Sequence, residues 1–146
     1  MKRSTQIIIA VLVVLVVPII HLTNKRLAME TLVGCYVARN DKNIYTLTIQ
    51  SHDMTVVRGI LSYRNHQMDS SAGIFEGTFL NDFLIGDYTM RVEGGDFVRQ
   101  MAFRKDGDTF YQGEGEVQLE GNRQVLINPK TISYENAIAF KKDDSC

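Results

Sequence analysis

The stretch from residue 73 to residue 119 constrains the fold of this 146-residue chain more than any other. Between residues 72 and 80, one set of alternate positions holds only glycine and phenylalanine: Gly73, Phe75, Gly77 and Phe79. A period of two is typical of a strand with one buried face. Asn81-Asp82 is a two-residue turn signal, and the alternation resumes after it. This stretch therefore predicts consecutive antiparallel hairpins.

The register of three successive hairpins can be predicted from their turns, because a wrong register by one residue would turn buried side chains outward. A turn at Asn81-Asp82 pairs Phe79 with Leu84, Gly77 with Gly86 and Phe75 with Tyr88. A turn at Gly94-Gly95 pairs Val92 with Phe97, Met90 with Arg99, Tyr88 with Met101 and Gly86 with Phe103. A three-residue loop, Asp106-Gly107-Asp108, sets Phe103 opposite Tyr111 and Met101 opposite Gly113. All three hairpins keep a common inner face.

The rest of the chain extends this meander. We expect further strands at residues 34–39, 44–51, 55–64, 109–120 and 137–142, and a short one near 125–127. The prediction is an all-β fold, an antiparallel up-and-down meander of about eight strands that forms a small barrel over residues 34–146, preceded by an N-terminal hydrophobic helix. Its outward positions are mostly polar, which argues against a membrane-spanning barrel.

The first part of the chain indicates export. Lys2-Arg3 precedes the apolar run Ile7–Ile20, which is the order of charge and hydrophobicity in an export signal. We assign residues 1–24 to an export signal or membrane anchor and 25–33 to a linker. We expect residues 7–22 to be retained as an inner-membrane anchor, with a cleaved signal as the alternative. Either outcome places the barrel outside the cytoplasm, in the periplasm.

Composition and motifs limit the possible functions. The net charge of −1 gives no general attraction to nucleic acid. The sequence holds no nucleophile elbow, zinc-binding H-E-x-x-H, P-loop or C-x-x-C motif. Aspartates fall in turns at one end of the meander, where their frequent use in turns explains them better than calcium binding does. We therefore expect no enzyme activity, no cofactor and no metal site.

Several motifs together resemble those of a family of small exported bacterial proteins, many of them described only as hypothetical lipoproteins. The motifs are Gly34-Cys35-Tyr36, the glycine–phenylalanine run from Asp69 to Phe79, Gly86-Asp87-Tyr88-Thr89 and Cys146. The resemblance implies a calycin-like β-barrel, and it implies no activity or ligand. This chain departs from lipoprotein members because Leu32-Val33-Gly34-Cys35 lies too far beyond the apolar run to serve as a lipidation site.

The two cysteines, Cys35 and Cys146, are predicted to form a disulfide. Export would place both in an oxidising compartment. If the final strand runs antiparallel to the first, the two cysteines lie close together, and the barrel then has an even number of strands. Part of the segment from residue 124 to residue 135 must in that case be a connection rather than a full strand.

The predicted registers gather an arginine and tyrosines inside the barrel. The tentative ligand-binding residues are Arg99, Tyr36, Tyr45, Tyr63, Tyr88 and Tyr111. A buried arginine without a carboxylate partner is costly, and tyrosine rings can hold a guanidinium by cation–π contact. The cluster is either a structural device near the barrel mouth or a site for an anionic ligand.

Two classes of function compete on the sequence. One is an exported, non-enzymatic protein-binding module, such as an inhibitor or envelope-assembly factor, that uses loops and its outer face, where Ile60 and Ile74 are neighbours. The alternative is a lipocalin-like barrel that binds a small molecule in an Arg/Tyr-lined interior. The partner is thus an envelope protein or a small ligand. A filled core with grouped exposed apolar residues would favour the first class, and a large cavity the second.

Overall fold

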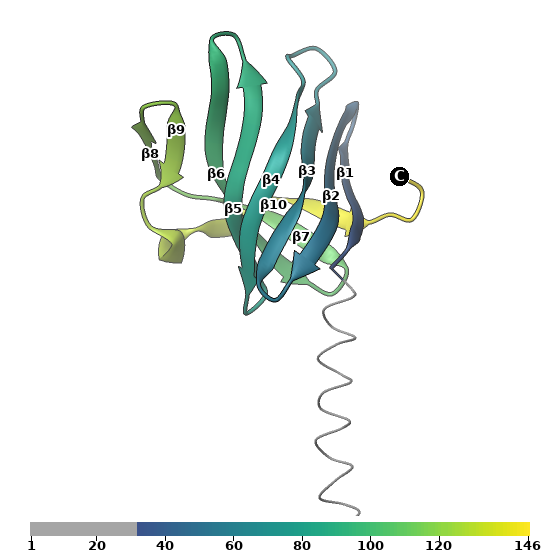
Figure 1. Cartoon of the computed structure of the whole chain (residues 1–146). Helices are drawn as coiled ribbons and strands as arrows, with labels where there is room; N and C mark the ends of the chain where they lie inside the picture. Colours follow the sequence, from purple (N-terminus) through teal and green to yellow (C-terminus); the bar gives the residue numbers. More distant parts are fainter. Residues whose placement is uncertain (1–31) are drawn as a thin grey trace, which may run out of the picture. The chain divides into compact units, whose positions relative to one another are not determined.

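The protein was analysed as a computed structural model that describes residues 32–146, so the expected export segment lies outside the described residues. Residues Val33–Cys146 form one compact unit (Figure 1). Its elements are β1 (Gly34–Asn40), β2 (Asn43–Asp53), β3 (Val56–Arg64), β4 (Ser71–Leu80), β5 (Phe83–Val92), β6 (Gly95–Asp106), β7 (Thr109–Glu114), β8 (Val117–Glu120), β9 (Arg123–Leu126), the 3-10 turn η1 (Pro129–Thr131) and β10 (Ser133–Lys142). Within residues 32–146, no helix is long and apolar enough to cross a membrane.

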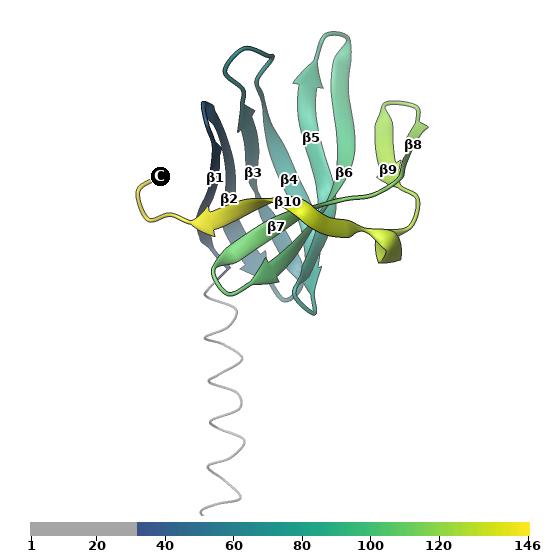
Figure 2. The same cartoon turned by 180° about the vertical axis from the view of Figure 1, so that it is seen from behind.

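Eight of the ten strands close into an antiparallel barrel. Each of β1 to β6 pairs with the strand that follows it in the chain. β7 then pairs with β10, and β10 pairs with β1, which closes the barrel. The predicted all-β meander of about eight strands is confirmed, and the strand count is even. Figure 2 shows β7 and β10 running across the lower half of the long strands β1 to β6, in front of them in this view.

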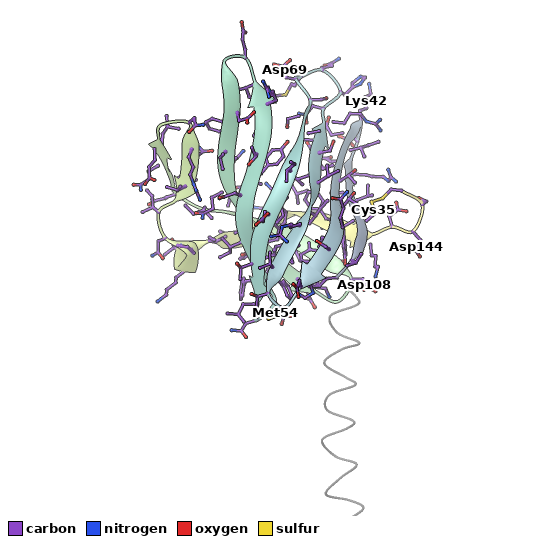
Figure 3. All side chains as sticks on the ribbon, viewed as in Figure 1. Cys35, Lys42, Met54, Asp69, Asp108 and Asp144 are labelled. Carbon is purple, nitrogen blue, oxygen red and sulfur yellow. A yellow bond between two sulfur atoms is a disulfide. The ribbon has the colours of Figure 1, made fainter. Side chains whose placement is uncertain are left out.

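The two ends of the barrel are named here by their turns. The turn at Lys42 and the loop at Asp69 mark the end called the mouth, and the turns at Met54 and Asp108 mark the opposite end, called the base (Figure 3). Two-residue turns join β1 to β2, β2 to β3, β4 to β5, β5 to β6 and β6 to β7. At the β4–β5 turn, Asn81 and Asp82 both have positive φ, of 51° and 65°, which is the conformation that a tight hairpin requires.

The barrel interior is filled with apolar side chains from the base to the middle. Phe103 lies at its centre, with its ring centroid 5.7 Å from that of Phe75, 5.8 Å from Phe140 and 6.5 Å from Phe110, all nearly edge to face. The core residues that are at most 1% exposed in this region are Tyr36, Leu47, Ile49, Val57, Leu61, Phe75, Leu84, Phe103, Phe110 and Phe140. Burial of this set supplies the main driving force for folding.

The inner glycines allow neighbouring strands to approach closely. Gly77 of β4 pairs with Gly86 of β5. A Cβ added at Gly77 would lie 2.6 Å from the carbonyl oxygen of Ile85 and 2.8 Å from Cα of Gly86. The strands therefore approach closely at a point where only glycine fits.

The first predicted hairpin register is confirmed and the second is wrong by two residues. Phe79 lies opposite Leu84 and Phe75 opposite Tyr88. The β5–β6 turn is Glu93-Gly94 rather than Gly94-Gly95, so Arg99 lies opposite Tyr88 instead of Met90. A shift of two residues keeps every side chain on its predicted face, and the inner face of β6 is therefore as expected.

The third predicted register is wrong by one residue, and this error changes the face. The β6–β7 turn contains only Gly107-Asp108, so Phe103 lies opposite Gln112 and Arg104 opposite Tyr111. Tyr111 and Gly113 therefore lie on the outer face, and Phe110 and Gln112 take the inner positions. The expected single strand over residues 109–120 is in fact two strands, β7 and β8, separated at Gly115-Glu116.

The strands β8 and β9 form a small hairpin outside the barrel. β9 pairs in parallel with β6 through Val98 opposite Arg123 and Arg99 opposite Gln124. The hairpin and η1 together provide the connection that an even strand count required. They carry the chain from β7 to β10 without adding a ninth barrel strand.

Cys35 and Cys146 form the predicted disulfide, with their Cα atoms 6.2 Å apart. The bond lies beside the weakest pairing of the barrel. β1 and β10 are joined by only two residue pairs, Tyr36 with Lys142 and Val37 with Lys141, and by one further backbone hydrogen bond, which the Asp143 amide donates to the Cys35 carbonyl at 2.9 Å. The disulfide thus secures the closure of the barrel.

Candidate functional site

Four of the six residues predicted to bind a ligand lie together on the inner face near the mouth. Tyr45 pairs with Tyr63 across β2 and β3, and Tyr88 pairs with Arg99 across β5 and β6. The ring centroids of Tyr45 and Tyr63 are 5.2 Å apart, and those of Tyr63 and Tyr88 are 5.9 Å apart. We call Tyr45, Tyr63, Tyr88 and Arg99, together with Gln112, the mouth cluster.

Hydrogen bonds fix two of the three tyrosines of the mouth cluster. The Tyr63 hydroxyl donates to Oε1 of Gln112 at 2.7 Å, and the Tyr88 hydroxyl donates to Oγ of Ser71 at 3.1 Å. Burial raises the pKa of Tyr63 above its usual value, while the nearby charge of Arg99 acts in the opposite direction. The bond from Tyr63 to Gln112 joins β3 to β7 across the barrel. It closes the apolar core toward the mouth.

Arg99 occupies the inner face but is exposed to solvent. Within residues 32–146, no carboxylate oxygen lies within 4 Å of its guanidinium, and the ion pairs found there use other arginines. The expectation of a buried arginine held by tyrosines is therefore wrong. An arginine in contact with water carries little desolvation cost, so no buried partner is needed.

The other two predicted residues do not belong to the mouth cluster. Tyr36 is fully buried at the base, where its ring meets that of Phe110 edge to face at 4.9 Å. Burial and the nearby charge of Asp108 raise its pKa to about 12. Tyr111 lies on the outer face because the β6–β7 turn contains only two residues, which sets Tyr111 opposite Arg104. Sequence reasoning also missed Gln112, whose inner position follows from the true β6–β7 turn.

Two open clefts flank the ribbon formed by β7 and β10. One, of about 640 Å³, lies between β1 and β10 and includes Tyr45 among its lining residues. The other, of about 230 Å³, is lined by Arg99, Gln112 and Glu114, among others. Tyr45 therefore borders one cleft and Arg99 and Gln112 border the other, whereas Tyr63 and Tyr88 line neither. Glu114 brings a carboxylate into the same cleft as Arg99, which lowers the preference of that cleft for an anion.

A separate groove lies on the outer face toward the base. It has a volume of about 540 Å³, and its lining residues are Phe83, Ile85, Arg104, Pro129, Lys130, Ile132 and Tyr134. We call these residues the Phe83 groove. Phe83 is 42% exposed, and its cross-strand partner Leu80, on the same face, is 59% exposed. The ring centroids of Phe83 and Tyr134 are 6.1 Å apart.

Gly113 makes this groove possible. A Cβ added at Gly113 would clash with Cγ2 of Ile132 and would lie 2.7 Å from Cε1 of Tyr134. Because Gly113 has no side chain, Ile132 and Tyr134 pack flat over the outer face of β7. The predicted register placed Gly113 on the inner face. The sequence predicts only a connection for part of residues 124–135, and it does not predict the contacts of Ile132 with this groove.

Within residues 32–146, no group of three or more histidine, cysteine, aspartate or glutamate side chains is placed to hold a metal ion. The aspartates of the base turns therefore do not assemble into a site in the described part of the chain.

Comparisons with known proteins yield no relative: no protein-family model, curated protein or solved structure matches the chain. The functional argument therefore depends on the geometry of the mouth cluster and the Phe83 groove.

Proposed function

We propose that this chain is an exported, non-enzymatic binding module whose target is another protein of the cell envelope. The observation that carries the proposal is the Phe83 groove, where exposed apolar side chains gather around a hollow while the barrel core is filled. Exposed apolar groups that cluster are typical of interaction sites. The Cys35–Cys146 disulfide is compatible with an oxidising compartment, and the apolar run Ile7–Ile20 is the expected route of export and membrane attachment.

A comparison of three tagged full-length proteins tests the proposal. The wild type, Phe83→Ser and Val92→Ser are used to capture partners from envelope extract, which are quantified by mass spectrometry. Val92 is 45% exposed at the opposite end of β5 from Phe83, and serves as a matched apolar control. We expect a protein captured by the wild type and by Val92→Ser to be lost with Phe83→Ser. Capture that all three proteins share equally contradicts a role for the groove.

A second candidate function is the binding of a small ligand by the mouth cluster. The observation that favours it is Arg99, a cation on the inner face with three tyrosines nearby and no ion-pair partner within residues 32–146. Because Arg99 is exposed, Arg99→Met should change the free energy of unfolding by less than about 0.5 kcal/mol. A loss of small-anion binding at unchanged stability would support this function. A large loss of stability would instead indicate a structural role.

A further inference from the structure

Arg104 stands at the centre of the Phe83 groove, held between two aromatic rings. Its guanidinium carbon lies 5.8 Å from the ring centroid of Tyr111 and 5.2 Å from that of Tyr134. On the sheet, Arg104 pairs with Phe83 on one side and with Tyr111 on the other. The cation is thus fixed next to the exposed apolar ring of Phe83. Cation–π contact orients it without neutralising its charge.

The charge of this groove is unbalanced. Within residues 32–146, neither Arg104 nor Lys130 has a carboxylate oxygen within 4 Å. None of the residues that line the groove is acidic. The backbone of Lys130 is positioned by η1, whose N-cap residue Asn128 accepts a hydrogen bond from the Lys130 amide at 3.0 Å through Oδ1. Arg104, held by two rings, and the exposed Lys130 therefore border an apolar hollow whose lining contains no acidic residue.

We propose that the Phe83 groove binds a short segment of a partner protein in which a carboxylate adjoins a large apolar side chain. The apolar side chain enters the hollow between Phe83, Ile132 and Tyr134. The carboxylate pairs with Arg104, whose planar guanidinium is suited to bidentate pairing, and with Lys130. The inference rests on the proposed protein-binding function and specifies the chemistry that the partner must present.

The occupant follows from the complementarity of charge and shape. A purely apolar segment would leave Arg104 covered and unpaired, which is costly. A purely acidic segment would leave the ring of Phe83 in water. Only a segment with both properties satisfies the cations and covers the apolar side chains together.

The test uses the purified full-length chain in detergent and three fluorescein-labelled hexapeptides, Gly-Ser-Leu-Glu-Ser-Gly and its variants with Leu-Gln or Ser-Glu at the centre. Binding is followed by fluorescence anisotropy. We expect the Leu-Glu peptide to bind at least about tenfold more tightly than either variant, since each variant lacks one of the two contacts. Arg104→Gln should reduce the affinity for Leu-Glu to that for Leu-Gln. Lys130→Gln should also weaken the preference for the Leu-Glu peptide. This variant tests the pairing of the carboxylate with a cation even if Arg104→Gln perturbs the fold.

The matched control is Arg91→Gln, since Arg91 is an exposed arginine on β5 whose contact with Asp96 is 3.8 Å long. This variant should bind the Leu-Glu peptide as the wild type does. Equal binding of all three peptides, or no binding of any, overturns the inference. So does tighter binding to anionic lipid vesicles than to the peptide, or a self-association of the chain that Arg104→Gln abolishes. Capture of an envelope protein through Phe83 together with equal peptide binding would retain the proposed function and reject only this ligand chemistry.

Discussion

The base and the mouth of the barrel differ in what fills them. Around Phe103 at the base, aromatic rings pack edge to face and are excluded from solvent. Near the mouth, tyrosine hydroxyls form hydrogen bonds and Arg99 is exposed to water. The comparison predicts that the base contributes more to the free energy of unfolding than the mouth does.

Truncation of the central base residue should have the largest effect. Phe103→Ala removes a ring that contacts three others, and the cavity should lower the free energy of unfolding by about 3–5 kcal/mol. The matched variant Phe97→Ala removes a half-buried ring on the same strand nearer the mouth. Its loss should be much smaller, because solvent already reaches that ring. Urea denaturation of both variants measures the difference, and equal losses would break the comparison between the ends.

Removal of the disulfide should come next. Cys35→Ser with Cys146→Ser should cost about 2–5 kcal/mol, because the bond restricts an unfolded chain over a separation of 111 residues. Amide hydrogen exchange should accelerate in β1 and β10 more than in β4 and β5, since only two residue pairs join β1 to β10. Uniform acceleration across all strands would show that the β1–β10 pairing is not locally weak.

High pH should produce the smallest effect, and it should act through buried tyrosines at both ends of the barrel. The pKa of Tyr36 is raised from 10.0 to about 12 in the folded protein. The neutral form is therefore favoured by folding, and its contribution is present below the ordinary tyrosine pKa and lost as the pH rises toward 12. Tyr63 acts in the same direction. Tyr36→Phe should reduce the loss of stability over this range, measured by urea midpoints, and an unchanged loss would contradict the assignment.

Much of the barrel can be predicted from the sequence because its turns are short and its inner faces are apolar. The Asn81-Asp82 turn fixes the register of β4 and β5 without ambiguity. At residues 93–95, both Glu93-Gly94 and Gly94-Gly95 form acceptable two-residue turns, and inward side chains face each other in either case. Local pattern alone could not distinguish them.

The site was harder to predict because one-residue differences in a turn decide the face of a strand. A two-residue turn at Gly107-Asp108 directs Tyr111 outward, where it holds Arg104 instead of lining the interior. The groove also needs Ile132 and Tyr134, which come from a segment with no regular period. Both side chains pack against Gly113, where a larger residue would clash with them. The alternation of apolar and polar residues along a strand does not predict such a tertiary contact. The available signal was the phenylalanine at the outward position 83, next to the outward Leu80 across the Asn81-Asp82 turn.

The pairing of β1 with β10 also affects the order in which the barrel can fold. The hairpins from β1 to β7 can form without β10, because each of these strands pairs with its neighbour in sequence. β1 keeps one edge unpaired until β10 has reached it. During that interval the open edge is available to other strands. Ring closure is thus a late, long-range step, and the chain depends on that step to become a barrel.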